Sequence, residues 1–247
     1  MLNQIFNEDC LEGMKRIPDK SVDMILCDLP YGTTGCKWDT IIPFEALWAE
    51  YERVIKGNGA IVLTAAQPFT SALVMSNPGL FRYEVIWEKD KGVDFGNANR
   101  KILNAHESVL FFYKKQPVYN RQDFPGAPYV KRNNNTETGH NLNFSGNKGG
   151  VWENKGTRAP KSVLKFNRVS AGGQRPLHPT QKPEELFEFL IKTYTNEGEI
   201  VLDNCMGSGT TAIACMNTKR NYIGFEMDET YFNLANKRIQ ERKEVDA

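Results

Sequence analysis

The chain has 247 residues, 40% hydrophobic and 25% charged, a globular balance that argues against wholesale disorder. A chain of this length buries about 70–75% of its unfolded surface, enough for one domain with a smaller insertion. No run of about 20 apolar residues and no signal peptide is visible, which argues against a membrane span and secretion. Five scattered cysteines without a C-x-x-C pair favour a reduced, cytoplasmic protein over a disulfide framework or a cysteine-based zinc site.

Apolar runs and periodicity predict alternating strands and a helix in the first half of the chain. Residues 22–28 form a short apolar run that ends in an acid and a turn, which is typical of a buried strand. Residues 44–56 have helical periodicity that stops at Gly57. Further strands are predicted at residues 60–65, 83–87 and 108–113.

The alternation is clearer towards the C-terminus. A helix is predicted at residues 184–194 directly after Pro183, because the first turn of a helix tolerates proline. The elements that follow are a strand at 199–203, a helix at 210–218, a strand at 222–226 and a helix at 229–242. Strands that alternate with helices predict an α/β fold with a mostly parallel sheet covered on both faces.

The net charge of +1 conceals a basic middle between two acidic ends. Residues 87–182 carry 17 Lys and Arg against 7 Asp and Glu, whereas residues 1–86 have a net charge of −4 and residues 183–247 of −5. This asymmetry suggests a segment that binds a polyanion, although a solvated basic surface explains the charge alone equally well. Weak apolar periodicity over residues 119–175 predicts loops that become ordered on a partner.

A glycine-rich turn near the C-terminus predicts a nucleotide or nucleoside ligand. Gly207, Gly209 and Ala212 fit the pattern G-x-G-x-x-A between a predicted strand and a predicted helix. Glu226, at the end of the next strand, is placed to accept both hydroxyls of a ribose. Asp203 just before the turn disfavours a pyrophosphate and hence NAD, because it would repel the phosphates, but an acid there suits an ammonium group. S-adenosylmethionine has ribose hydroxyls and an α-amino group but no phosphate.

The predicted strand at residues 22–28 ends in Asp28-Leu29-Pro30-Tyr31, at the sheet edge where ligands of α/β folds bind. This tetrapeptide resembles the signature of the amino-group DNA methyltransferases, [Asp/Asn/Ser]-Pro-Pro-[Tyr/Phe/Trp]. Leu29 departs from the signature but leaves its chemical groups intact. An exocyclic amine is a poor nucleophile, so two acceptors, the Asp28 carboxylate and the Pro30 carbonyl, would hold both of its hydrogens. Tyr31 would stack on the base once it is flipped from the duplex.

The resemblance covers most of the chain and implies more than the catalytic motif. The order of catalytic motif, basic segment and cofactor motif is that of the β group of these enzymes, whose Rossmann-like sheet is circularly permuted. The implied division is a catalytic half at residues 1–114, an inserted target-recognition region at 115–177 and a cofactor-binding half at 178–247. Asp28, Pro30 and Tyr31 are the implied catalytic residues. The implied activity is transfer of a methyl group from S-adenosylmethionine to a DNA base, with the aspartate favouring adenine N6 over cytosine N4.

The cofactor residues implied by the two motifs and the resemblance are Asp9, Cys10, Asp28, Thr180, Lys182, Asp203, Gly207, Gly209, Thr210, Thr211, Phe225, Glu226 and Met227. The side chains expected to contact the cofactor adenine are Asp9, Cys10, Phe225 and Met227. Lys182 and Thr180 would face the methionine carboxylate. Two alternatives remain open: Asp203 caps the glycine turn instead of binding ligand, and Cys10 is a small buried side chain.

The expected partner is double-stranded DNA, and the candidate DNA-binding residues are Lys37, Arg121, Arg132, Arg158, Arg168 and Arg175. A homodimer and a partner restriction endonuclease are left open. A metal pair of His106 and Glu107 is disfavoured, because the chain has only three histidines. The rival functions are methylation of RNA or of protein glutamine, a catalytically silent DNA-binding protein on the same fold, and a dehydrogenase. Asp28 opposes the protein-glutamine enzymes, which carry Asn at that position.

Overall fold

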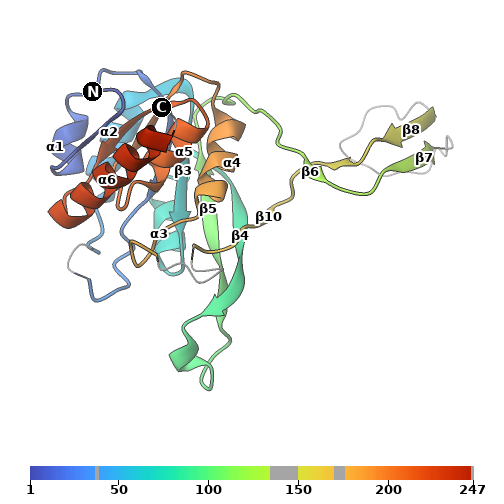
Figure 1. The fold of residues 1–247 in the computed structure, drawn as a ribbon, viewed down its shortest axis with the longest axis horizontal. Helices are drawn as coiled ribbons and strands as arrows, with labels where there is room; N and C mark the ends of the chain where they lie inside the picture. Colours follow the sequence, from blue (N-terminus) through green and yellow to red (C-terminus); the bar gives the residue numbers. More distant parts are fainter. Residues whose placement is uncertain (37–38, 134–149, 170–175, 246–247) are drawn as a thin grey trace. The chain divides into compact units, whose positions relative to one another are not determined.

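A computed structural model describes residues 1–36, 39–133, 150–169 and 176–245, and its main feature is an eight-stranded sheet (Figure 1). The strand order is β1-β12-β11-β2-β3-β5-β4-β10. Neighbouring strands are parallel except at β3–β5 and β4–β5. The strands are β1 (Gln4–Phe6), β2 (Val22–Asp28), β3 (Ile55–Ala65), β4 (Phe81–Val93), β5 (Asn104–Phe112), β10 (Val163–Lys165), β11 (Ile200–Asp203) and β12 (Asn221–Phe225). The predicted α/β fold with a mostly parallel sheet is confirmed.

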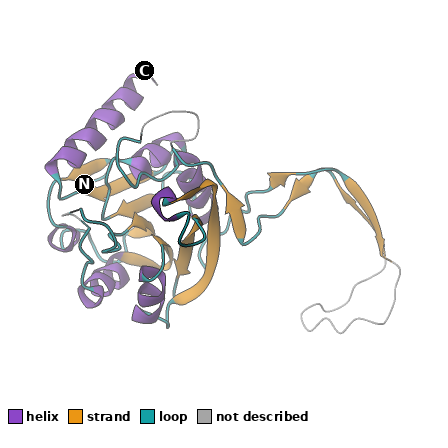
Figure 2. Cartoon of the chain, turned by 90° about the horizontal axis from the view of Figure 1, so that it is seen from below, coloured by secondary structure: helices purple, strands orange, loops and turns teal. Residues whose placement is uncertain are grey.

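Helices pack on both faces of this sheet (Figure 2). The helices of one face are α1 (Cys10–Met14), α2 (Phe44–Val54) and α3 (Phe69–Ser76), and those of the other are α4 (Glu184–Tyr194), α5 (Thr210–Asn217) and α6 (Glu229–Val245). Side chains of β2 alternate between the two cores: Met24 and Leu26 pack with α4 and α5, whereas Ile25 and Cys27 pack with α2. Burial on both faces therefore explains why the four central residues of β2, Met24 to Cys27, are all apolar.

The second helix ends earlier than the periodicity predicts. Helix α2 stops at Val54, and Ile55 already has the extended conformation of β3 (φ −70°, ψ 138°). The pairing of β2 with β3 shifts between Val22, which lies opposite Ile55, and Met24, which lies opposite Ala60, so the start of β3 pairs irregularly. A Cβ at Gly59 would lie 2.7 Å from the Ile55 side chain and 2.8 Å from a backbone oxygen. Gly59 is therefore required by the close packing at the start of β3, and the glycines of this segment do not mark the end of the helix.

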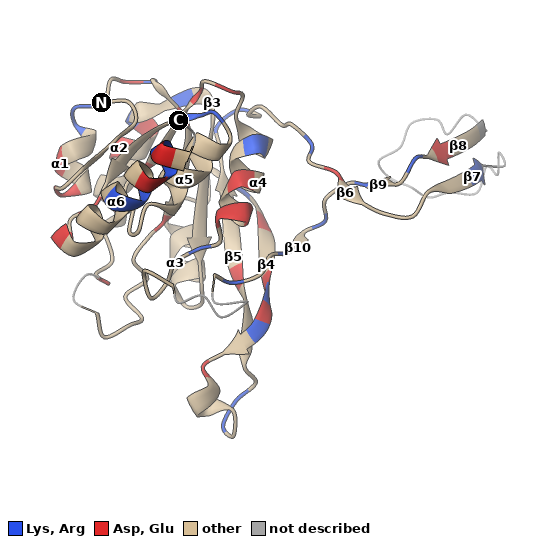
Figure 3. Cartoon of the chain, in the orientation of Figure 1, with Lys and Arg blue, Asp and Glu red and all other residues tan. Residues whose placement is uncertain are grey.

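Strands β4 and β5 are longer than the apolar runs that predict them. Strand β4 continues to Val93 and contains several charged residues, and β5 begins at Asn104 with a polar stretch that includes Glu107 (Figure 3). In this part the register places Glu88 opposite His106 and Trp87 opposite Glu107. Backbone pairing extends both strands beyond the core, and apolar periodicity cannot detect such an extension. Helix η1 (Phe95–Asn97) lies in the connection between them.

The chain divides into two compact units, residues 1–120 with 161–247 and residues 121–160. The described part of the smaller unit contains two antiparallel pairs. Their strands are β6 (Phe124–Pro125) with β9 (Thr157–Arg158), and β7 (Tyr129–Asn133) with β8 (Gly150–Asn154). The expectation of loops over residues 119–175 is therefore wrong for these strands and for β10. Their side chains are largely exposed, which removes the apolar pattern that would reveal a strand.

Among the described residues, no helix combines the length and the apolar character that crossing a membrane requires. All five cysteines lie in the described part of the chain and are free thiols. No group of three or more His, Cys, Asp or Glu side chains placed to hold a metal ion occurs in the described ranges.

Candidate active site

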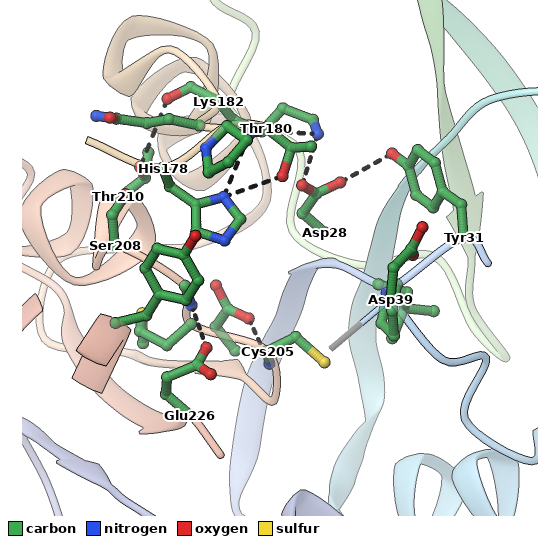
Figure 4. A pocket seen from close by; sticks show the side chains of 18 of the residues that line it. Asp28, Tyr31, Asp39, His178, Thr180, Lys182, Cys205, Ser208, Thr210 and Glu226 are labelled. Carbon is green, nitrogen blue, oxygen red and sulfur yellow. Dashed lines mark hydrogen bonds and ion pairs between the residues drawn. The ribbon is translucent and has the colours of Figure 1, made fainter. Parts of the chain in front are cut away.

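A cavity of about 740 Å³ opens at the carboxyl ends of the parallel strands β2, β11 and β12 (Figure 4). Parallel strands end in loops at one edge, so residues distant in sequence meet there. The predicted residues that line the cavity are Asp9, Cys10, Asp28, Pro30, Tyr31, Arg168, Thr180, Lys182, Asp203, Gly207, Thr210, Thr211, Glu226 and Met227. The structure thus brings the two motifs of the sequence, about 175 positions apart, to one site.

Asp28, the last residue of β2, is held by three side chains. Tyr31 donates its hydroxyl hydrogen to Oδ1 at 2.8 Å, and the Thr64 hydroxyl donates to the same oxygen. Oδ2 accepts a hydrogen bond from the Lys182 ammonium at 2.5 Å. Burial and the neighbouring Asp28 carboxylate raise the pKa of Tyr31 well above its ordinary value, so Tyr31 is protonated and a hydrogen donor here. The carboxylate is therefore fixed in orientation, with one oxygen given to Lys182.

The ring of Tyr31 is also fixed. It stacks on Phe69 with ring centroids 5.1 Å apart and an interplanar angle of 22°. The Lys182 ammonium lies 5.6 Å from the centroid of the tyrosine ring. Stacking of Tyr31 on a flipped base remains a prediction; in this structure the residue orients Asp28.

Glu107 and Lys89 complete a charged group that sequence reasoning missed. Lys182 contacts Glu107 Oε2 at 3.3 Å, and Lys89 contacts the other oxygen, Oε1, at 2.6 Å. Burial alone would raise the pKa of Glu107, but the two ammonium groups outweigh it and lower the pKa. Likewise burial would lower the pKa of Lys182, but Asp28 and Glu107 outweigh burial and raise it. In the sequence, Glu107 stood out only as a neighbour of His106.

Asp39 holds the loop that follows the tetrapeptide. Its carboxylate accepts backbone hydrogen bonds from Gly32 at 2.8 Å, Thr33 at 2.9 Å and Thr34 at 2.6 Å. Burial favours the neutral acid, but these hydrogen bonds outweigh it and lower the pKa of Asp39. Gly32 has φ +68°, a conformation that favours glycine. The sequence analysis assigned Asp39 no role. The signal that could have identified it is an acid seven positions after Gly32, close enough to fold back and accept hydrogen bonds from the turn.

The glycine turn and Glu226 form the opposite wall of the cavity. Glu226 follows β12 and accepts backbone hydrogen bonds from Gly207 at 2.7 Å and Asp228 at 2.8 Å. Burial raises the pKa of Glu226 despite these bonds. Gly207 has φ +54° and turns the chain so that its amide points at this carboxylate. The remaining lone pairs of Glu226 suit a donor such as a hydroxyl group.

Two predicted cofactor residues, Phe225 and Gly209, do not line the cavity. Phe225 is fully buried in the core, with its ring 5.8 Å from Phe6 and so close to Gly13 that a Cβ there would overlap it. Met227, on the other side of Glu226, lines the cavity and is 66% exposed. Gly209 has φ +86° at the start of α5 and faces α6, where a Cβ would lie 3.1 Å from Ala235. Strand alternation could have predicted the burial of Phe225.

The remaining predicted residues are held by local bonds. Asp9 caps α1 by accepting backbone hydrogen bonds from Leu11 and Glu12. The Cys10 sulfur accepts a hydrogen bond from Asn204 at 3.5 Å. Thr180 lies against the His178 ring, with Oγ1 at 3.1 Å from Nδ1. Each lines the cavity and is held there by a hydrogen bond to a neighbouring residue.

Asp203 satisfies its hydrogen bonds inside the protein. One oxygen accepts from the Cys205 amide at 3.0 Å, and the other accepts from the Thr211 hydroxyl. The residue is 2% exposed, and burial raises its pKa to about 6. These contacts favour the capping alternative over a direct contact with a ligand ammonium group.

We expect Asp203→Asn to stabilise the protein at pH 7.5. A pKa raised from 3.8 to about 6 means that the folded state holds a proton more tightly than the unfolded state, so stability falls as pH rises from about 4 to 6. At about 1.36 kcal/mol per pKa unit, ionised Asp203 costs on the order of 1–3 kcal/mol at neutral pH. Urea unfolding at pH 4 and pH 7.5 measures this difference. A variant that is less stable than the wild type at pH 7.5 would contradict the account of Asp203.

The DNA methylase family model for N6 and N4 enzymes matches residues 22–237, which is most of the chain. The chain belongs to this DNA methylase family. It is 30% identical to type II methyltransferase M.HinfI of Haemophilus influenzae, over 98% of this chain and 69% of that protein. It is 28% identical to DNA adenine methyltransferase YhdJ of Escherichia coli, over 95% of this chain and 82% of that one.

A solved structure of a relative has the same fold. The crystal structure of the M1.HpyAVI–SAM complex is 26% identical and aligns with a TM-score of 0.63 over 95% of this chain and 98% of that one. The predicted resemblance to the amino-methylating DNA methyltransferases is therefore confirmed. The tetrapeptide with Leu29 and the glycine turn both lie inside the matched range.

The candidate DNA-binding residues of this methylase have different surroundings. Lys37 and Arg175 lie outside the described residues. Arg121 pairs with Asp123, and Arg168 pairs with Asp90 at 3.0 Å. Arg158 bonds to the Asn154 side chain and its guanidinium lies over Tyr129. Arg132, on strand β7, is exposed. Arg132 is therefore the most direct candidate for a contact with DNA.

Proposed function

We propose that this methylase transfers a methyl group from S-adenosylmethionine to the N6 amine of adenine in duplex DNA. The observation that carries the proposal is that the Asp28 carboxylate and Pro30 line the same cavity as Glu226 and the glycine turn. An amine acceptor site and a nucleoside site thus share one cavity at the sheet edge. The printed name of the Escherichia coli relative, DNA adenine methyltransferase, supports adenine as the base.

The residues fit the cofactor. The glycine turn exposes backbone to the cavity, Glu226 provides acceptor oxygens for ribose hydroxyls, and Met227 provides an apolar surface for adenine. Asp9 and Cys10 line the same cavity, as do Thr210 and Thr211. When bound, S-adenosylmethionine supplies an electrophilic sulfonium methyl group. The M1.HpyAVI relative is solved as a complex with SAM, which supports the assignment.

Asp28 and Pro30 activate the target amine. Its lone pair is delocalised into the base, and two acceptors that hold both N–H hydrogens draw the nitrogen towards tetrahedral geometry. Tyr31 and Thr64 hold Oδ1 of Asp28, so the carboxylate is oriented before the base arrives. Pro30 has a fixed φ and restricts the conformation of Leu29, and both effects help to direct the Pro30 carbonyl at the amine. Positioning of this kind contributes most of the catalysis when the electrophile is already reactive.

Analysis of the modified nucleosides tests the proposal. Purified protein is incubated with bacterial genomic DNA and isotopically labelled S-adenosylmethionine, and the nucleosides are separated by chromatography and mass spectrometry. We expect labelled N6-methyldeoxyadenosine. Labelled N4-methyldeoxycytidine would correct the base, and label in RNA or protein but not in DNA would overturn the DNA substrate.

The proposal extends to a restriction–modification system, a cytoplasmic location, a homodimer and a partner endonuclease. M.HinfI is named a type II methyltransferase, which supports a place for this chain in a restriction–modification system. A DNA substrate would place the chain in the cytoplasm. Analytical ultracentrifugation with and without duplex tests a homodimer. Genes that neighbour this one and confer cleavage of unmodified DNA would establish a cognate endonuclease.

The target-recognition role of residues 115–177 predicts salt-dependent binding. If about five basic side chains meet phosphates, log affinity against log salt should have a slope of about −4 to −5. Arg132→Ala should lower affinity and either reduce the slope by about one or relax specificity at one base pair. Fluorescence anisotropy at several salt concentrations measures both. Lys243→Ala, an exposed change in the acidic C-terminal segment, is the control. A slope near zero would show that the inserted region does not bind the backbone of DNA.

A further inference from the structure

Four charged side chains form an alternating series at the sheet edge: Asp28, Lys182, Glu107 and Lys89. Lys182 joins the two carboxylates, at 2.5 Å from Asp28 and 3.3 Å from Glu107, and Lys89 ends the series at 2.6 Å from Glu107. They come from β2, the loop before α4, β5 and β4. Their formal charges cancel if all four are ionised.

The series is too buried to be a surface network. The side chains of Lys182, Lys89 and Glu107 are 5%, 9% and 13% exposed. Burying paired charges has a desolvation cost that often exceeds their attraction, so such a group is weak evidence for stability. It is also adjacent to Asp28, which the proposed reaction uses. We therefore look for a role of these four side chains in the reaction and not in stability.

The target amine and Lys182 compete for the same oxygen. Tyr31 and Thr64 both hold Oδ1 of Asp28, and the Lys182 ammonium holds Oδ2. An amine that donates to Asp28 therefore has to share Oδ2 with Lys182 or replace the ammonium there, and replacement frees the oxygen of its competing positive charge. An ammonium displaced into a buried site without another acceptor would be costly.

Glu107 provides that other acceptor. Its Oε2 is already 3.3 Å from the ammonium, and the carbonyl oxygen of Thr180 is 3.4 Å away. Lys182 therefore already has Glu107 within contact distance if it leaves Asp28. Lys89 occupies the second oxygen of Glu107 and lies 5.1 Å from the centroid of the Trp87 ring, which fixes the carboxylate in place.

We propose that Glu107 is a positioning residue, which accepts the Lys182 ammonium when the target amine binds Asp28, and that Lys89 holds Glu107 for this purpose. The inference rests on the proposed function of Asp28. Glu107 acts through Lys182 and does not touch the base. The network thus protects the Asp28 carboxylate in the free enzyme and releases it to substrate.

The single-turnover rate of methyl transfer, with cofactor and DNA saturating, tests the proposal. Glu107→Gln keeps the shape but removes the charge, and we expect the rate to fall about 10- to 100-fold, as for misplaced reacting groups. Affinity for S-adenosylmethionine should change less than about twofold, and Glu107→Asp should recover part of the rate. The matched control is Glu88→Gln on the neighbouring strand, whose exposed carboxylate lies 3.7 Å from Lys165. A wild-type rate in Glu107→Gln would overturn the proposal.

A second pair of variants separates positioning from a structural role. If Glu107 acts only through Lys182, then adding Glu107→Gln to Lys182→Met should change the residual rate by less than about twofold. A structural role predicts that Glu107→Gln lowers the rate equally in both backgrounds. An equal decrease would therefore contradict the proposal.

A substrate-free measurement distinguishes failure of this inference from failure of the proposed function. NMR of protein whose lysines carry ¹³C at Cε reports the Lys182 pKa in the free protein. The Lys182 signal is identified as the one that is missing from the spectrum of Lys182→Arg. We expect Glu107→Gln to lower this pKa by about one pH unit or more, because a buried opposite charge is lost. An unchanged Lys182 pKa would show that Glu107 does not hold the ammonium. Wild-type protein that methylates no DNA would instead overturn the proposed function, whatever the NMR result.

Discussion

Asp28→Ala should reduce methyl transfer at least about 10²–10³-fold while the protein stays folded. Alanine removes both acceptor oxygens, whereas asparagine, which the family signature also allows here, would keep one. Alanine also removes the charge that pairs with Lys182, although Glu107 still contacts that ammonium. The measurement is the initial rate of tritiated methyl transfer to cognate duplex, with circular dichroism to check the fold.

The control for Asp28 comes from the same strand. Asp23→Asn at the other end of β2 changes an acid that pairs with Lys56 and accepts a hydrogen bond from the Ile200 amide. It lies outside the cavity lining, so turnover per folded molecule should stay within about twofold of the wild type. Near wild-type turnover in Asp28→Ala would show that another group accepts the hydrogens of the amine.

Glu226→Ala should weaken binding of S-adenosylmethionine by about one to two orders of magnitude. Hydrogen bonds to a charged group are worth roughly 1.5–3 kcal/mol each, less the hydration regained, and 1.4 kcal/mol is about tenfold in affinity. The side chain also accepts from Gly207 and Asp228, so the alanine loosens the glycine turn as well. Glu226→Gln, which retains one acceptor oxygen, should lose less.

Isothermal titration calorimetry measures the effect at Glu226. DNA affinity should remain within about twofold, since the residue lies on the cofactor side of the cavity in the proposed arrangement. The matched control is Glu229→Gln, three positions later at the start of α6 and exposed. Unchanged cofactor affinity in Glu226→Ala would remove the ribose role.

The sequence predicts the parts of this fold where the chain is buried on both faces. Strand β2 and helix α4 have the bounds expected from their apolar patterns. Each turn of the helix and both faces of the strand contribute side chains to the core. The same logic locates Asp28 and Glu226, which directly follow or end buried parallel strands. Residues at such ends must share one sheet edge, so their meeting in a cavity follows from topology.

Other features depend on contacts between distant segments and left no local pattern. Glu107 and Lys89 lie on polar stretches of two antiparallel strands, and only the sheet register brings them to Lys182. The Asp39 carboxylate accepts hydrogen bonds from backbone amides earlier in the same loop, and this loop has no apolar periodicity that would predict the contact. The exposed strands β7 and β8 pair with each other and bury too little to show an apolar alternation. In each case the determining interaction is tertiary.

The central claim is that Asp28 presents one acceptor to an exocyclic amine of DNA. Single-molecule sequencing of DNA from cells that express the wild type, or Asp28→Ala, at equal protein levels tests it most directly. We predict N6-methyladenine in one sequence context with the wild type and its loss with Asp28→Ala. Methylation that persists in Asp28→Ala at wild-type extent, or no modified base with the wild type, would contradict the claim.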